Sequence, residues 1–233
     1  SIFPGWTIGS ERGWERWVVA DGVTNLGRTY FSNLVFEDPN WDYRTFDFDA
    51  DLAFAESKVG FHADAIETDL SAAKQQGVKI IQYHGWNDQT LQPGYSPIYY
   101  ERVVAEMGGL VETQDFYRLF MVPGMAHCYR GAGANSFGGV GQQIPPHRDA
   151  MHDVQVALEE WVETGVAPDQ LIATKYIDDD ADTTTKSTHC AYDRLIVANA
   201  GALAGAVAGS IVAKTSTHIE YTLQVPIQGM QLV

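Results

Sequence analysis

The chain has 233 residues, 45% of them hydrophobic and 19% charged, so it can bury a core and is too apolar for a disordered tail. Its formal net charge is −15, and no five-residue window holds more than two Lys or Arg, which excludes nucleic-acid binding because the surface would repel phosphate. The two cysteines, Cys128 and Cys190, are too few for a disulfide scaffold or a four-ligand zinc site.

The N-terminal 45 residues are rich in loop-forming sequence, with a short helix expected around residues 14–20. They lack the basic start and apolar core of a signal peptide. Because the first residue is not Met, we expect that an upstream segment has been removed. The start of a calcium-binding loop is similar to the spacing of Asp47, Asp49 and Asp51. However, Leu52 stands where the loop needs glycine and Lys58 stands where it needs a bidentate Glu, so we favour a solvated turn.

The central part of the chain has the pattern of a strand, a helix and a second strand. Residues 63–76 first predict a surface helix that ends at Gly77. Strands are then expected at residues 78–83 (VKIIQY) and 116–122 (FYRLFMV), with a helix at residues 99–107 between them. Such a unit makes the strands parallel, so the loops that follow them meet at one edge of the sheet.

The remaining elements are a helix at residues 149–163 and a last strand at residues 171–176. The uncharged stretch at residues 195–213 has the length of a membrane span, but it consists largely of Ala and Gly and contains two polar residues. We therefore favour a packed or poorly ordered terminus over a membrane segment. Pro226 and the polar alternation before it predict at most an edge strand there.

Three polar residues follow the two central strands. His84 and Asp88 come after the first strand, and His127 comes after the second. An Asp followed later by a His, each just past a parallel strand, has the order of the last two members of an α/β-hydrolase triad. The alternatives to a catalytic pair are an Asp that only caps the loop and a His that only lies at the surface. We interpret His84 as structural, packed under Asp88.

Two longer segments resemble the tannase and feruloyl esterase family of serine esterases. They are KIIQYHGWNDQTLQPGYSPIYYERVVAEMGG and DFYRLFMVPGMAHCYRGAG, within a resemblance that is strongest over residues 46–180. The family's triad Asp and His match Asp88 and His127. The resemblance implies an α/β fold with an α/β-hydrolase-type parallel sheet, in which residues 1–233 form a single region, the C-terminal portion of the catalytic domain, with an atypical tail at residues 191–233.

The chain departs from the family pattern at the nucleophile. The family's Gly-Cys-Ser-x-Gly-Gly elbow, which precedes a large lid, is absent, and Ser96 and Ser136 lack the strand-turn-helix context that would replace it. We therefore expect residues 1–233 alone to be inactive, and an upstream segment to supply the nucleophile and the lid. The family's calcium site would also lie in that lid, so we expect no cofactor and no metal here.

The second departure concerns sulfur. In the family, the Cys beside the catalytic His is bonded to the Cys before the nucleophile, and Cys128 matches the first of these. A disulfide from Cys128 to an upstream chain is one expectation. A bridge between Cys128 and Cys190, or two free thiols, are the alternatives.

The resemblance implies a secreted or periplasmic hydrolase of phenolic-acid esters, of the feruloyl esterase or tannase type, without membrane attachment. Two alternative functions remain open: the chain is a non-catalytic fragment, or it belongs to another serine hydrolase such as a peptidase. Tyr95, Tyr129 and Phe137 are candidates to line an acyl pocket. The glycines of residues 131–141 lack the pattern of a phosphate loop, and His147 and His152 would diverge on a helix, which argues against zinc.

Overall fold

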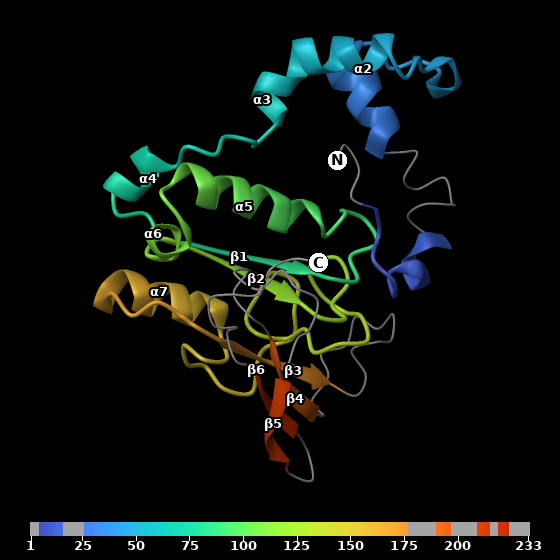
Figure 1. Cartoon of the computed structure of the whole chain (residues 1–233). Coiled ribbons are helices and arrows are strands. Elements are labelled where there is room, and N and C mark those ends of the chain that lie inside the picture. The colour runs from blue at the N-terminus through green and yellow to red at the C-terminus, as the bar shows by residue number, and fades with distance from the viewer. Residues whose placement is uncertain (1–4, 16–25, 177–189, 197–208, 215–218, 224–233) are drawn as a thin grey trace. The chain divides into compact units, whose positions relative to one another are not determined.

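The computed structural model describes residues 5–15, 26–176, 190–196, 209–214 and 219–223 (Figure 1). The chain divides into two compact units, one formed by Glu11–Glu67 and the other by Ser1–Ser10 together with Thr68–Val233. Each unit is described by itself. The expectation of a single region over residues 1–233 stays a prediction, as does the helix at residues 14–20, most of which lies outside the described residues.

The smaller unit consists of short helical segments around a cluster of aromatic rings. Its elements are η1 (Glu11–Gly13), η3 (Tyr30–Val35), η4 (Tyr43–Thr45), α2 (Ala50–Ala55), η5 (Glu56–Gly60) and α3 (Phe61–Ala63). The carboxylate of Asp47 accepts hydrogen bonds from the backbone N–H groups of Asp49 and Ala50, and Asp51 accepts one from Asp47. These carboxylates therefore serve the turn before α2, as expected for a solvated turn.

The larger unit contains the predicted parallel pair of strands. Strand β1 (Ile80–Gly85) pairs with β2 (Tyr117–Val122) in parallel, from Ile80 opposite Tyr117 to Gly85 opposite Val122. Helix α4 (Ser71–Gln75) precedes β1, and α5 (Tyr95–Glu106) and α6 (Leu110–Gln114) connect the two strands. The expected strand, helix and strand are thus confirmed.

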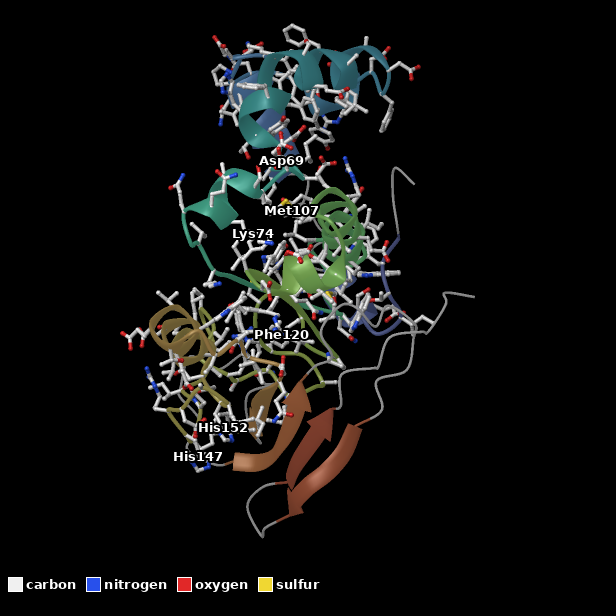
Figure 2. All side chains as sticks on the ribbon, turned by 60° about the vertical axis from the view of Figure 1, so that its left-hand side comes forward. Asp69, Lys74, Met107, Phe120, His147 and His152 are labelled. Atoms are coloured by element: carbon white, nitrogen blue, oxygen red, sulfur yellow. The ribbon has the colours of Figure 1, made fainter. Side chains whose placement is uncertain are left out.

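Alternation along β2 gives the pair of strands two apolar faces. Leu119 and Met121 pack with Tyr100 and Val103 of α5 on one face. Phe120 packs on the other face with Val122 and with residues of α7 (Val154–Thr164). Figure 1 shows α5 and α7 on opposite sides of these strands, and Figure 2 labels Phe120 on the α7 side and Met107 on the α5 side.

Antiparallel strands complete the described part of the larger unit. The fully buried strand β3 (Leu171–Tyr176) pairs with β4 (Cys190–Ile196), and β5 (Gly209–Lys214) pairs with β6 (Ile219–Leu223). Strand β6 falls where an edge strand was predicted. In the described part of the chain, no helix is long and apolar enough to cross a membrane.

Two predicted helices have different bounds. The helix expected at residues 63–76 is wrong over most of its length, because Asp64 is extended and the Asp69 carboxylate accepts from the backbone N–H of Ser71, where α4 begins. Helix α5 begins at Tyr95, earlier than expected, since Pro97 falls in its first turn, where a backbone donor has no helical partner.

The segment before α7 is a turn and not a helix. Asp149 accepts from the backbone N–H groups of Met151 and His152 and lies 2.7 Å from Nδ1 of His152. His147 and His152 therefore do not diverge on a helix as expected, and their ring centroids are 4.8 Å apart (Figure 2). Among the described residues there is still no group of three or more potential metal ligands.

Asp153 caps α7 and should be important for its stability. Its buried carboxylate accepts from the backbone N–H groups of Gln155 and Val156 and lies 2.8 Å from Nε of Arg148. We expect Asp153→Ala to lower the free energy of unfolding by about 1–3 kcal/mol, because the cap is lost and the N–H groups of Gln155 and Val156 lose their acceptor. Asp153→Asn keeps a capping side chain and should lower the free energy of unfolding by less than about 1 kcal/mol. Thermal unfolding of the full-length variants measures both, and equal losses would contradict the cap.

Candidate active site

Backbone hydrogen bonds join the loops that follow β1 and β2. The N–H of Trp86 donates to the carbonyl of Val122 at 2.9 Å, and the N–H of Asn87 donates to that of Met125 at 2.9 Å. The parallel pairing is thereby extended beyond the strands and into the loops. Asp88 and His127, each a residue or two farther along its loop, become neighbours.

Gly85 permits this close approach. A Cβ atom at this position would lie 2.3 Å from the carbonyl oxygen of Met125 and 2.6 Å from that of Ala126. Because both obstacles are backbone atoms, a side chain there would push the second loop away. Only glycine lets the residue before His127 lie against the end of β1.

The loop after β2 folds back on itself. The N–H of Gly133 donates to the carbonyl of Gly124 at 3.0 Å, and the N–H of Ala126 donates to that of Arg130 at 3.1 Å. Cys128 and Arg130 have φ values of 63° and 60°, which residues other than glycine seldom adopt. The loop therefore turns sharply on either side of Tyr129. The turn presents His127 and the Cys128 thiol at the edge of the sheet.

Two side chains from distant parts of the sequence hold this loop. The buried Lys175 on β3 donates from Nζ to the carbonyl of Gly131 at 2.6 Å. Gln142 donates from Nε2 to the carbonyl of Cys128 at 3.0 Å, while its Oε1 accepts from the N–H groups of Phe137 and Gly139. Gly131 and Gly133 in this loop permit close backbone packing, because a Cβ at either would lie within 2.2 Å of a carbonyl oxygen.

Asp88 lies at the centre of the site and is 1% exposed. Its Oδ1 accepts from the N–H groups of Thr90 at 2.7 Å and Leu91 at 2.8 Å. Its Oδ2 lies 2.8 Å from Nδ1 of His127 and 3.1 Å from Nε2 of His84. The structure therefore brings together the three polar residues that the sequence places after the two strands.

The charge on Asp88 is stabilised by these contacts. Burial opposes ionisation, but the hydrogen bonds from His84, His127, Leu91 and Thr90 outweigh it and hold the pKa of Asp88 below its ordinary value. The side chain is therefore a carboxylate at neutral pH and can only accept hydrogen bonds. The nitrogen of each imidazole that faces it must carry a proton.

His127 uses one ring nitrogen in its contact with Asp88 and leaves the other open. Nδ1 carries the proton that meets the carboxylate, and none of the described residues forms a hydrogen bond with Nε2, so in the neutral imidazole Nε2 keeps a free lone pair. The side chain is 34% exposed. It borders a cavity of about 470 Å³ whose lining includes Leu91, Tyr95 and Met125.

The other candidate residues are placed differently. Ser96 is buried and lies 2.7 Å from Nδ1 of His84, not beside His127, and Ser136 is fully buried opposite Thr174. Of the three aromatic candidates for the acyl pocket, Tyr95 lines the cavity. Phe137 is instead packed in the core against Tyr83, and Tyr129 is 39% exposed and outside the cavity lining.

Cys128 is an exposed free thiol, and desolvation together with the charge of Asp88 raises its pKa. Among the described residues it has no disulfide partner, and the side chain of Cys190 lies outside them. Sequence reasoning missed Lys175 and Gln142, whose contacts with this loop have no local sequence signal.

Comparisons with known proteins identify the family of this chain. A family model described as tannase and feruloyl esterase matches residues 5–205. A probable feruloyl esterase B-1 of Aspergillus terreus is 36% identical over 195 residues, which are 83% of this chain and 36% of that protein. An uncharacterized esterase of Xanthomonas campestris is 35% identical over 192 residues, 72% of this chain and 33% of that protein.

A solved structure is similar over the same part of the chain. The crystal structure of feruloyl esterase B from Aspergillus oryzae has a TM-score of 0.61 and 29% sequence identity, over 72% of this chain and 32% of that one. The fold is therefore α/β and that of these esterases. The chain spans about a third of the length of the relatives it matches.

Gly85 gives a test of how the two loops are held together. We expect Gly85→Ala to lower the free energy of unfolding by about 1–3 kcal/mol, because the added carbon meets two backbone carbonyls that have no room to move. Gly27→Ala is the matched control, because a Cβ at this helical position meets nothing within 4 Å. Thermal unfolding measures both, and equal stability of the two variants would contradict the close approach.

The lowered pKa of Asp88 predicts how its contribution to stability depends on pH. A carboxyl group whose folded pKa lies below its unfolded value stabilises the fold fully above the unfolded value, here 3.8, and loses this effect as the pH falls through the folded pKa. Wild type should therefore be more stable than Asp88→Asn at neutral pH, and the difference should shrink below pH 3.8. Urea unfolding at several pH values measures it, and a difference that grows in that acidic range would be contrary to this sign.

Proposed function

We propose, because the chain belongs to the tannase and feruloyl esterase family, that it forms part of an enzyme that hydrolyses carboxylic esters of phenolic acids. The observation that carries the proposal is the 2.8 Å hydrogen bond between His127 Nδ1 and the buried carboxylate of Asp88. This contact leaves Nε2 of His127 unprotonated at the border of a cavity.

The geometry supports acid–base catalysis of acyl transfer. Nε2 of His127 takes the proton of a serine hydroxyl as its oxygen attacks the ester carbonyl, and Asp88 stabilises the imidazolium that forms. The imidazolium then returns this proton to the leaving alkoxide, which departs as the alcohol and leaves an acyl-enzyme. Water repeats the sequence, because His127 removes its proton during attack and returns the proton to the serine oxygen.

The nucleophile in this proposal is a serine outside residues 1–233, carried with the lid by an upstream segment. Buried Ser96 and Ser136 both have other neighbours, and no described serine is hydrogen-bonded to His127. The exposed thiol of Cys128, directly after His127, is accessible to a cysteine of that segment. A disulfide there would fit a secreted or periplasmic enzyme.

The apolar and aromatic part of the cavity lining supports an aromatic acyl group. Leu91, Tyr95 and Met125 line the cavity of about 470 Å³, which is large enough for a substituted phenyl ring. Feruloyl and galloyl esters are both in this class.

Two variants of the full-length protein test the mechanism. His127→Ala should lower kcat for an arylester at least about a thousandfold, because the base is lost. Asp88→Asn should lower it by a similar factor, because the amide donates to Nδ1 and moves the imidazole proton to Nε2. Steady-state hydrolysis measures both, and substantial turnover by His127→Ala would end the assignment.

A fluorophosphonate probe then identifies the nucleophile. We expect labelling of an upstream serine in the full-length protein and no labelling of residues 1–233, while Ser96→Ala should lower kcat by less than about tenfold. Labelling of no residue supports a non-catalytic fragment. Faster hydrolysis of amides than of phenolic esters supports a peptidase.

A further inference from the structure

His84 shares the carboxylate oxygen that orients His127. It lies on β1 with its side chain 14% exposed, and its Nε2 is 3.1 Å from Oδ2 of Asp88, the atom that lies 2.8 Å from Nδ1 of His127. Two imidazoles therefore approach one oxygen, one from a strand and one from a loop. Sequence reasoning interpreted His84 as packing only.

A chain of hydrogen bonds determines which nitrogen of His84 carries the proton. The Tyr117 hydroxyl, whose pKa is raised by burial, donates to Oε1 of Gln82. The amide nitrogen of Gln82 therefore faces Ser96 and donates to its Oγ at 3.0 Å. The Ser96 hydroxyl proton is then directed to Nδ1 of His84, 2.7 Å away.

Every donor in this chain points toward Asp88. Because Nδ1 of His84 accepts from Ser96, the ring proton is on Nε2, where it meets Oδ2 of Asp88. With a neutral imidazole at His84, the order from Tyr117 through Gln82, Ser96 and His84 to Asp88 gives every donor an acceptor. The network thus has a direction, and it ends at the oxygen that accepts from His127.

We propose that His84 is a positioning residue that acts through Asp88, holding Oδ2 in place for His127 and withdrawing part of its negative charge. Oδ1 is held by the backbone N–H groups of Thr90 and Leu91, so the bond from His84 fixes the remaining oxygen. The inference rests on the proposed function, because it assigns His84 to the same reaction.

Other titratable groups surround this network. They are Tyr83 on β1, Tyr95, Tyr99 and Tyr100 on α5 and Cys128 in the loop after β2. None of the described Lys or Arg residues lines the cavity. Removal of the His84 donor should therefore concentrate charge on Oδ2, stabilise the imidazolium of His127 and raise the pH at which it loses its proton.

Two polar substitutions in the full-length enzyme separate this role from packing. Gln at residue 84 carries an amide N–H at about the reach of Nε2, whereas Asn is too short to reach Asp88. We expect His84→Asn to lower kcat for an arylester about 10- to 100-fold with KM within about threefold, and to move the acid limb of the pH profile upward. His84→Gln should keep kcat within about fivefold of wild type and leave the acid limb of the pH profile in place.

Controls make the outcomes distinct. His147→Asn is the same change at an exposed histidine outside the cavity lining and should have no effect. If thermal unfolding shows that His84→Asn does not fold, Ser96→Ala takes its place in the test. Ser96→Ala should lower kcat by a smaller factor and move the acid limb of the pH profile in the same direction. Suppose that the acid limb does not move in a folded His84→Asn or Ser96→Ala enzyme and that the enzyme still requires His127. This result would overturn the role of His84 and leave the proposed function standing. Hydrolysis that persists in His127→Ala would overturn the proposed function as well.

Discussion

The parallel pairing of β1 with β2 is the constraint on which the site depends, because it continues past the last strand residues. Backbone hydrogen bonds from Trp86 and Asn87 carry the register into both loops. The missing side chain at Gly85 lets the carbonyls of Met125 and Ala126 lie against the end of β1. The separation of Asp88 and His127 is therefore a property of the backbone, and their side chains need only ordinary conformations to meet.

A buried carboxylate needs stabilisation, and four hydrogen-bond donors supply it at Asp88. Asp88 is surrounded by two backbone N–H groups and two ring nitrogens, and none of the cavity-lining residues is a Lys or Arg. A cation at this position would compete with His127 for the carboxylate and weaken the imidazolium. These hydrogen bonds hold the pKa of Asp88 below its ordinary value without a Lys or Arg among the described residues at the cavity.

The parts of the molecule that follow local patterns were predictable from sequence. A β-branched run identified β1, and an apolar, aromatic run ended by Pro123 and Gly124 identified β2, so Asp88 and His127 were expected at one edge of the sheet. The helix at residues 63–76 was wrong because Asp69 offers the backbone a competing bond that starts α4 later. The contacts of Lys175 and Gln142 with the loop of His127 could not be predicted, since they join residues far apart in sequence and depend on tertiary packing.

The tight glycine contacts of the loop after β2 have a consequence for how such enzymes diversify. Cβ atoms at Gly124, Gly131 and Gly133 would lie 2.5, 2.2 and 1.9 Å from neighbouring backbone, so the loop tolerates few sequence changes. The stretch from Ile80 to Gly133 therefore has to keep its backbone contacts for Asp88 and His127 to meet. Substitutions that alter the cavity are better accommodated at Leu91 and Tyr95, whose side chains line it and take no part in these glycine contacts.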